Sequence, residues 1–201
     1  MGPNDIVGGR RGFFAVMSDS FDAAGLKRDP DGGFGIEMIY RKPYAACRHC
    51  HPPVEAAITL RESHGIDDMQ IKSIRVKTYY AAVFGHDYTD IQGITLAKMS
   101  VPFSVAVALK TARGGLNEFM PRYIEDEEVL ALTRKVSVTE DEALSALVPQ
   151  KRAAIVEVVM NNGETHTCRV DYPLGEPENP MSPRDVEQKF VSLAMYAGKT
   201  E

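Results

Sequence analysis

The chain has 201 residues and a formal net charge of −5; 44% of its residues are hydrophobic and 25% are charged. This is the composition of one globular domain or slightly more, and it excludes a disordered chain. The negative balance argues against nucleic acid as a partner, because phosphate binding needs clustered Lys and Arg.

The first half of the chain predicts a short helix, a linker, a strand and a second helix. Residues 12–21 place Phe13, Phe14, Val16, Met17 and Phe21 at near-helical spacing. A linker rich in Asp, Pro and Gly follows over 27–35. We expect a strand over 34–40, and then a helix that Pro52 opens and Gly65 ends.

The middle of the chain alternates apolar strands with helices. Residues 71–80 predict a strand of mixed alternation, and 84–92 are rich in turn residues. Residues 95–112 predict one buried helix with Pro102 in its early part. Residues 125–133 predict a helix with an acidic start, and 136–138 a short strand.

The clearest local signal is a hairpin near the C-terminal end. Two β-branched runs, 154–160 and 164–170, flank an Asn-Asn-Gly sequence, which predicts a tight primed turn. After the loop 175–183, Ser182 and Asp185 form a capping box for a last helix. The order of elements indicates the α+β class, with helices and mostly antiparallel strands.

No segment indicates a membrane or an export signal. The longest uncharged run, 99–109, is too short to span a bilayer, and the N-terminal residues lack an apolar stretch followed by a cleavage site. Three cysteines are an odd number in a chain with no export signal. We therefore expect reduced thiols and a cytoplasmic location.

Reactive side chains are densest between Arg41 and His51, where three cations, two thiols, two imidazoles and one phenol precede a predicted helix. A helix N-terminus offers free N–H groups and a positive dipole end. With Lys42 and Arg48 it predicts a site for a carboxylate or phosphate. Cys47, His49 or His51 would be available for proton transfer.

Three other interpretations of this cluster remain open. Cys47, Cys50 and His51 match the c-type haem attachment pattern. Cys47, Cys50 and a neighbouring His could hold zinc together with Cys168, although a second ligand pair at defined spacing is missing. The segment could also be a connection whose cysteines pack as small hydrophobic groups.

Several segments resemble, in order, the MmgE/PrpD family of 2-methylcitrate dehydratase and cis-aconitate decarboxylase. They are RGFFAVMS, RKPYAACRHCHPPVEAAITL, AKMSVPFSVAVAL, KRAAIVEVVMNNGE and LGEPENPMSPRDVEQKF. The resemblance covers nearly the whole chain and implies the C-terminal half of a family member. Residues 1–33 would then belong to an all-helical domain, 34–174 to the α+β domain, and 175–201 to a loop and C-terminal helix.

The resemblance implies a lyase without cofactor or metal, acting on a small di- or tricarboxylate. The active site would need a separately encoded helical domain, or a homo-oligomer such as a dimer, and the chain alone would be inactive. Lys42, His51 and Cys47 would be catalytic, although the decarboxylase branch has a His in place of Cys47. Substrate contacts would come from Arg48, Tyr79, Tyr80, Lys98 and Ser100.

Two rival functions remain. A truncated or degenerate domain would fold without catalysis, because a fold does not guarantee function. An isomerase or epimerase of a carboxylate would need the same cations and a second proton donor.

The adjacent residues His86 and Asp87 indicate a surface turn more than a catalytic pair, because an Asp side chain often hydrogen-bonds to nearby backbone in turns. We expect the apolar faces of the first and last helices to need a partner.

Overall fold

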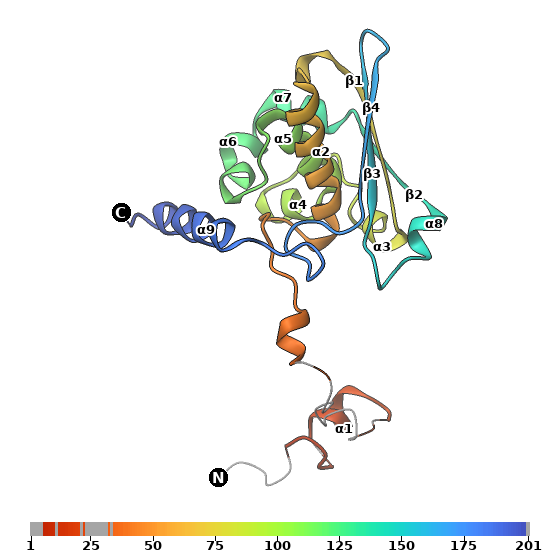
Figure 1. The fold of residues 1–201 in the computed structure, drawn as a ribbon, viewed down its shortest axis with the longest axis vertical. Helices are drawn as coiled ribbons and strands as arrows, with labels where there is room; N and C mark the ends of the chain where they lie inside the picture. The colour runs from red at the N-terminus through yellow and green to blue at the C-terminus, as the bar shows by residue number, and fades with distance from the viewer. Residues whose placement is uncertain (1–5, 11, 21, 23–31, 33, 200–201) are drawn as a thin grey trace. The chain divides into compact units, whose positions relative to one another are not determined.

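The fold is described from a computed structural model of the chain, which places residues 6–10, 12–20, 22, 32 and 34–199. The chain divides into two units, Met1–Ile39 and Tyr40–Glu201. The second unit holds the sheet, most of the helices and all the predicted site residues (Figure 1).

The first unit contains the helix α1 (Phe13–Met17) and the 3-10 helix η2 (Gly35–Met38). The predicted first helix is therefore confirmed over a shorter span, and Phe21 lies outside the described residues. The predicted strand at 34–40 is wrong. Glu37 N–H donates to Phe34 O at 2.9 Å, so the segment closes a local turn, and the described residues pair no strand with it.

The second unit is built on a four-stranded mixed sheet. Its strands lie in the order β2 (Val136–Glu140), β1 (Ile71–Thr78), β3 (Ala154–Met160) and β4 (Thr165–Val170). β1 runs parallel to β2, whereas β1–β3 and β3–β4 are antiparallel. With the helices, the sheet confirms the predicted α+β class. The parallel pair requires a crossover, which the segment between β1 and β2 supplies.

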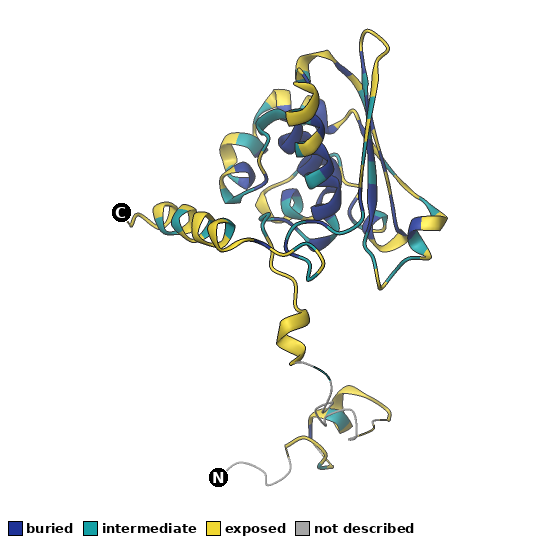
Figure 2. Ribbon diagram, in the orientation of Figure 1, coloured by how far each residue is buried: buried dark blue, intermediate teal, exposed yellow. Residues whose placement is uncertain are grey.

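Side chains alternate across the sheet, so that one face is buried and the other faces solvent (Figure 2). β3 alternates strictly, but β1 buries Ile71, then Ile74, Val76 and Thr78. The register of β1 against β3 shifts between Ile71 and Ser73. This irregularity explains the mixed alternation that the sequence shows over 71–80.

The helices α2 and α5 pack on the buried face of the sheet, and α7 packs on α5 (Figure 1). The shorter helices surround them. The helical segments are η3 (Arg48–Cys50), α2 (His51–His64), η4 (Asp68–Gln70), α3 (Tyr80–Val83), α4 (Ile94–Met99), α5 (Val101–Thr111), η5 (Leu116–Phe119), α6 (Pro121–Ile124), α7 (Glu127–Thr133), α8 (Glu142–Ser145) and α9 (Pro183–Tyr196). The helices predicted at 52–63, 125–133 and the C-terminal end are confirmed by α2, α7 and α9.

The single helix predicted at 95–112 is instead two helices, α4 and α5, separated at Ser100. The Ser100 hydroxyl oxygen accepts from Phe103 N–H at 3.0 Å and so caps a new helix. Pro102 has no N–H to donate to the carbonyl four residues earlier. That carbonyl, Lys98 O, accepts instead from Cys47 N–H at 2.8 Å. The break therefore provides an acceptor for the loop that carries the candidate site.

The hairpin of β3 and β4 is confirmed, but its predicted two-residue primed turn is wrong. Met160 N–H donates to Glu164 O at 2.8 Å, which leaves three residues in the connection. Gly163 has φ +91°, and Asn161 and Asn162 have negative φ. A type I′ turn needs two residues with positive φ, so the longer connection with one left-handed glycine forms here.

The last helix, α9, has the expected capping box: Ser182 accepts from Asp185 N–H, and Asp185 accepts from Ser182 N–H. α9 has no buried residue. Phe190 is 71% exposed and Leu193 42%. Within the described parts of the chain, no helix has the length and apolar character needed to cross a membrane.

Candidate active site

The loop 41–47 enters α2 and is tied to three other parts of the second unit. Cys47 N–H donates to Lys98 O at the α4–α5 break. Ala45 N–H donates to Gly114 O at 2.9 Å, and Arg41 N–H donates to Gly175 O at 2.8 Å. The two ends of this loop are thereby fixed against segments that are distant in sequence.

Gly175 is the point where the 175–183 loop meets the site loop. Its φ is +93°, and a Cβ at this position would lie 2.0 Å from Arg41 O. Backbone on both sides must shift to relieve such a contact. We expect Gly175→Ala to lower the free energy of unfolding by about 2 kcal/mol or more, measured by urea denaturation.

The hairpin glycine is the matched control for that substitution. Gly163 has nearly the same φ, +91°, but nothing lies within 4 Å of its added Cβ. Gly163→Ala should therefore lower the free energy of unfolding only by the strain of an alanine in the left-handed region, about 1 kcal/mol. Equal losses in the two variants would show that the Gly175–Arg41 contact does not constrain the loop.

The polar side chains that the fold brings together are Cys47, His49, Tyr79 and His86. His49 Nδ1 lies 2.6 Å from the Tyr79 hydroxyl, and Cys47 Sγ lies 3.5 Å from His86 Nε2. The two imidazole rings are in edge contact, with their centroids 4.7 Å apart. Cys47 and His49 are half-buried, whereas Tyr79 and His86 are buried. The cluster joins the start of α2 to the end of β1 and the turn after α3.

The electrostatics of this cluster keep His49 neutral. Burial, and then the nearby His86, Arg152 and Lys42, together lower the pKa of His49 to about 4. Burial raises the pKa of the Tyr79 hydroxyl, which therefore stays protonated. The His49 imidazole is therefore unprotonated at neutral pH but is a weak base in the empty site, and a carboxylate bound beside it would raise its pKa and strengthen it as a proton acceptor.

Arg48 and His51 form a buried network beneath the loop. Arg48 donates to Glu176 and lies 2.9 Å from His51 Nδ1, and its guanidinium lies 4.5 Å from the Tyr40 ring centroid. His51 Nε2 lies 3.3 Å from Ala46 O. Burial, and then the charge of Arg48, lower the pKa of His51 to about 3.

This network leaves neither residue open to a substrate. Both ring nitrogens of His51 have partners, and the side chain has no exposed surface. The charge of Arg48 is matched by Glu176. Arg48 and His51 therefore hold the loop in place through their contacts with Glu176 and Ala46 O.

The other predicted site residues lie in different surroundings. Lys42 is exposed, with Nζ 3.5 Å from Ala46 O, and Lys98 is half-buried beside the loop. Ser100 is buried and serves as the cap of α5. Tyr79 joins the cluster through His49, whereas Tyr80 is exposed and stacks on Phe84.

Sequence reasoning missed His86 and Arg152. The surface turn expected for His86-Asp87 is wrong for His86, which is 9% exposed with its Nδ1 3.0 Å from Phe84 O. Asp87 alone is exposed. Arg152 lies just before β3, and it contributes to the low pKa of His49. Neither residue has a local pattern that indicates the cluster, because both reach it through tertiary contacts.

The three cysteines are free and lie in different environments. Cys50 is completely buried, which raises the pKa of its thiol to about 12, and Cys168 lies on β4. Covalent haem attachment requires both thiols and the following His to be accessible. The burial of Cys50 and His51 contradicts that interpretation, and Cys50 packs as a small hydrophobic residue.

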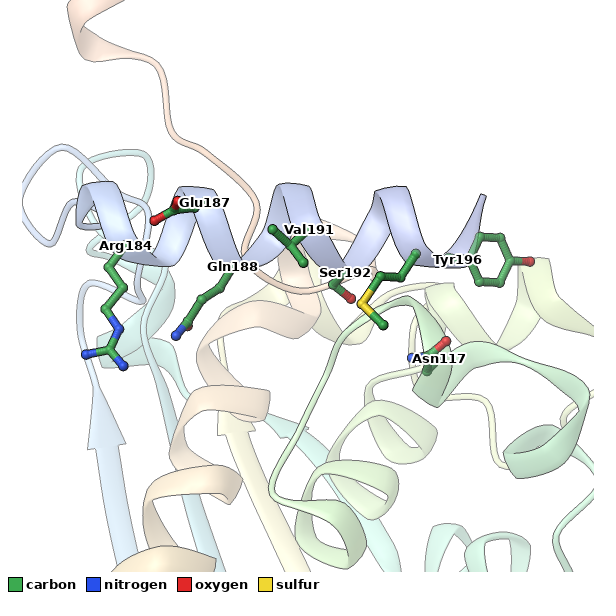
Figure 3. Close-up of a pocket in the computed structure, with 8 residues that line it drawn as sticks. Asn117, Arg184, Glu187, Gln188, Val191, Ser192 and Tyr196 are labelled. Carbon is green, nitrogen blue, oxygen red and sulfur yellow. The ribbon is translucent and has the colours of Figure 1, made fainter. Parts of the chain in front are cut away.

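A separate hollow of about 670 Å³ lies along α9 (Figure 3). Its lining residues are Asn117, Arg184, Glu187, Gln188, Val191, Ser192, Met195 and Tyr196. Most come from one helix, and no His or Cys is among them. The groups suited to proton transfer lie instead in the cluster around His49.

The fold and the cluster define a small α+β domain that carries reactive side chains between a loop, a strand end and a turn. The chain belongs to the MmgE/PrpD family, since residues 44–201 match the model of the MmgE/PrpD C-terminal domain. The resemblance seen in the sequence is thereby confirmed. A search of curated proteins gave no match.

Proposed function

We propose that this chain is the C-terminal part of a cofactor-independent lyase, a dehydratase acting on a small di- or tricarboxylate. The observation that supports it most is neutral His49, hydrogen-bonded to Tyr79 and close to Lys42 and Arg152. Membership of the MmgE/PrpD family supports the same chemistry.

Loss of water from a hydroxy acid needs three things from the protein. A base removes the proton from the carbon next to a carboxylate, an acid protonates the leaving hydroxyl, and cations stabilise the charge that grows on the carboxylate. His49 is the base in this proposal, and Lys42 binds the carboxylate. Cys47 or Tyr79 donates the proton to the leaving hydroxyl.

A helical domain outside these 201 residues completes the site in this proposal. Exposed apolar side chains on each unit support such a partner: Phe13 is 61% exposed on α1, and Phe190 is 71% exposed on α9. Patches of this kind mark protein interfaces. We also propose a cytoplasmic location, which the three free cysteines support.

Replacing the base tests the proposal. In the chain assembled with its helical domain, we expect His49→Asn to lower kcat for dehydration about 100-fold or more, because a positioned base contributes at least that factor. His166→Asn on β4 is the matched control and should leave kcat unchanged. An unchanged kcat in His49→Asn would remove His49 from the mechanism. If the unmodified chain assembles with its helical domain but the assembly shows no turnover, the result would favour a non-catalytic domain.

A further inference from the structure

We propose that Cys47, His49 and His86 form a binding site for a divalent transition metal of the Zn²⁺ class. Each residue offers one ligand atom, and the three atoms all lie within 4.8 Å of one another. The sequence did not suggest this set, because its zinc alternative combined Cys47 and Cys50 with a neighbouring His and Cys168 and left out His86.

The spacing of Cys47 and His86 matches tetrahedral coordination. Zinc bonds of about 2.3 Å to sulfur and about 2.05 Å to nitrogen, at a tetrahedral angle, put the two ligand atoms about 3.5 Å apart. Cys47 Sγ and His86 Nε2 are 3.5 Å apart. His49 can complete the set by a side-chain movement of at most about 1.3 Å, since the ligand atoms lie within 4.8 Å of one another and the tetrahedral spacing is about 3.5 Å.

Hydrogen bonds to the other side of each ring support the imidazole ligands. His86 Nδ1 lies 3.0 Å from Phe84 O, so it carries the proton and leaves a lone pair on Nε2, the nitrogen that faces Cys47. His49 Nδ1 lies 2.6 Å from the Tyr79 hydroxyl, which leaves Nε2 of that ring as the nitrogen for the metal. Metal-binding histidines usually have such partners, which orient the ring and raise its basicity.

The kind of ligand decides the class of metal. A thiolate with two imidazoles suits Zn²⁺ and Co²⁺, whereas Mg²⁺ and Ca²⁺ prefer oxygen ligands. Three protein ligands leave a fourth position open. Because Lys42 and Arg152 add positive charge around His49, we expect that position to take an anion such as a carboxylate.

This inference goes beyond the proposed lyase and does not rest on it, since binding is measured without turnover. A bound metal takes the lone pair of His49 and the thiolate of Cys47, so the metal-bound chain is a separate state from the one that transfers protons in the proposed lyase. The full chain would be titrated with Co²⁺ under reducing conditions, and then with Zn²⁺ in competition. We expect one Co²⁺ per chain, a thiolate-to-cobalt charge-transfer band, and loss of that band on adding Zn²⁺. The band should disappear in Cys47→Ser, and Co²⁺ affinity should fall at least tenfold in His86→Ala.

Two control variants separate this site from adventitious binding. Cys168→Ser removes another free thiol, and His166→Ala removes the ring that contacts His64 at 4.3 Å. Both should keep the band and the affinity of the unmodified chain. Circular dichroism would establish that each variant is folded. Absence of the band in the folded, unmodified chain would overturn the inference, as would its loss in Cys168→Ser or its persistence in Cys47→Ser.

Discussion

Lys42→Ala should lower the turnover of the assembled enzyme about 1,000-fold while leaving the domain folded. In the proposed reaction, Lys42 is the cation that meets the charge developing on the substrate carboxylate. Loss of one such preorganised group typically removes about 3 to 4 kcal/mol of transition-state stabilisation. The fold should tolerate the change, because Lys42 is exposed and its ammonium donates a long hydrogen bond, 3.5 Å, to Ala46 O.

The measurement is kcat and KM for dehydration, with the thermal melting temperature recorded for each variant. Lys72→Ala, an exposed lysine on β1, is the matched control and should behave as the unmodified chain. Lys42→Arg keeps the charge and should retain more activity than Lys42→Ala. Full turnover in Lys42→Ala would exclude Lys42 from the site.

Arg48→Ala should lower the free energy of unfolding by about 3 kcal/mol or more. Arg48 is 6% exposed and pairs with Glu176, whose side chain is 13% exposed. Without Arg48, the Glu176 carboxylate is left without its cation, and His51 Nδ1 loses a partner. The pair also joins the start of α2 to the 175–183 loop, so the substitution should loosen the site loop.

Urea denaturation of two variants separates the contribution of the charge pair from that of side-chain packing. Arg48→Ala leaves one charge unpaired, whereas Arg48→Met with Glu176→Leu removes both charges and keeps most of the volume. We expect the double variant to be more stable than Arg48→Ala, because a buried pair is costly mainly when one partner remains alone. If Arg48→Ala lowers the free energy of unfolding by less than about 1 kcal/mol, the ion pair is hydrated and contributes little to stability.

Much of the fold is predictable from local patterns. The hairpin, the capped last helix and α2 each have a signal within a few residues: an Asn-Gly pair, a capping box, or an early Pro followed by a terminal Gly. Two of the errors, the unbroken helix at 95–112 and the strand at 34–40, arose where tertiary structure decides. No sequence pattern near Ser100 shows that Lys98 O accepts a hydrogen bond from the distant Cys47 N–H. The segment 34–40 is as apolar as a strand, but no described strand lies beside it.

The candidate site is predictable only in part. The cluster 41–51 has an unusual density of reactive groups, and two of its members, Cys47 and His49, lie in the site that the fold assembles. The sequence does not distinguish His49 from His51, two residues later. At the start of α2, His51 lies in the interior, where its two ring nitrogens contact Arg48 and Ala46 O.

The most direct test of the central claim is a dehydration assay on the chain purified with its helical domain. Loss of water from 2-methylcitrate and related hydroxy di- and tricarboxylates would be followed by NMR. We expect the assembled enzyme to form the unsaturated acid, and the chain alone and the Lys42→Ala assembly to form almost none. A stable, folded assembly that dehydrates none of these acids would contradict the proposed lyase function.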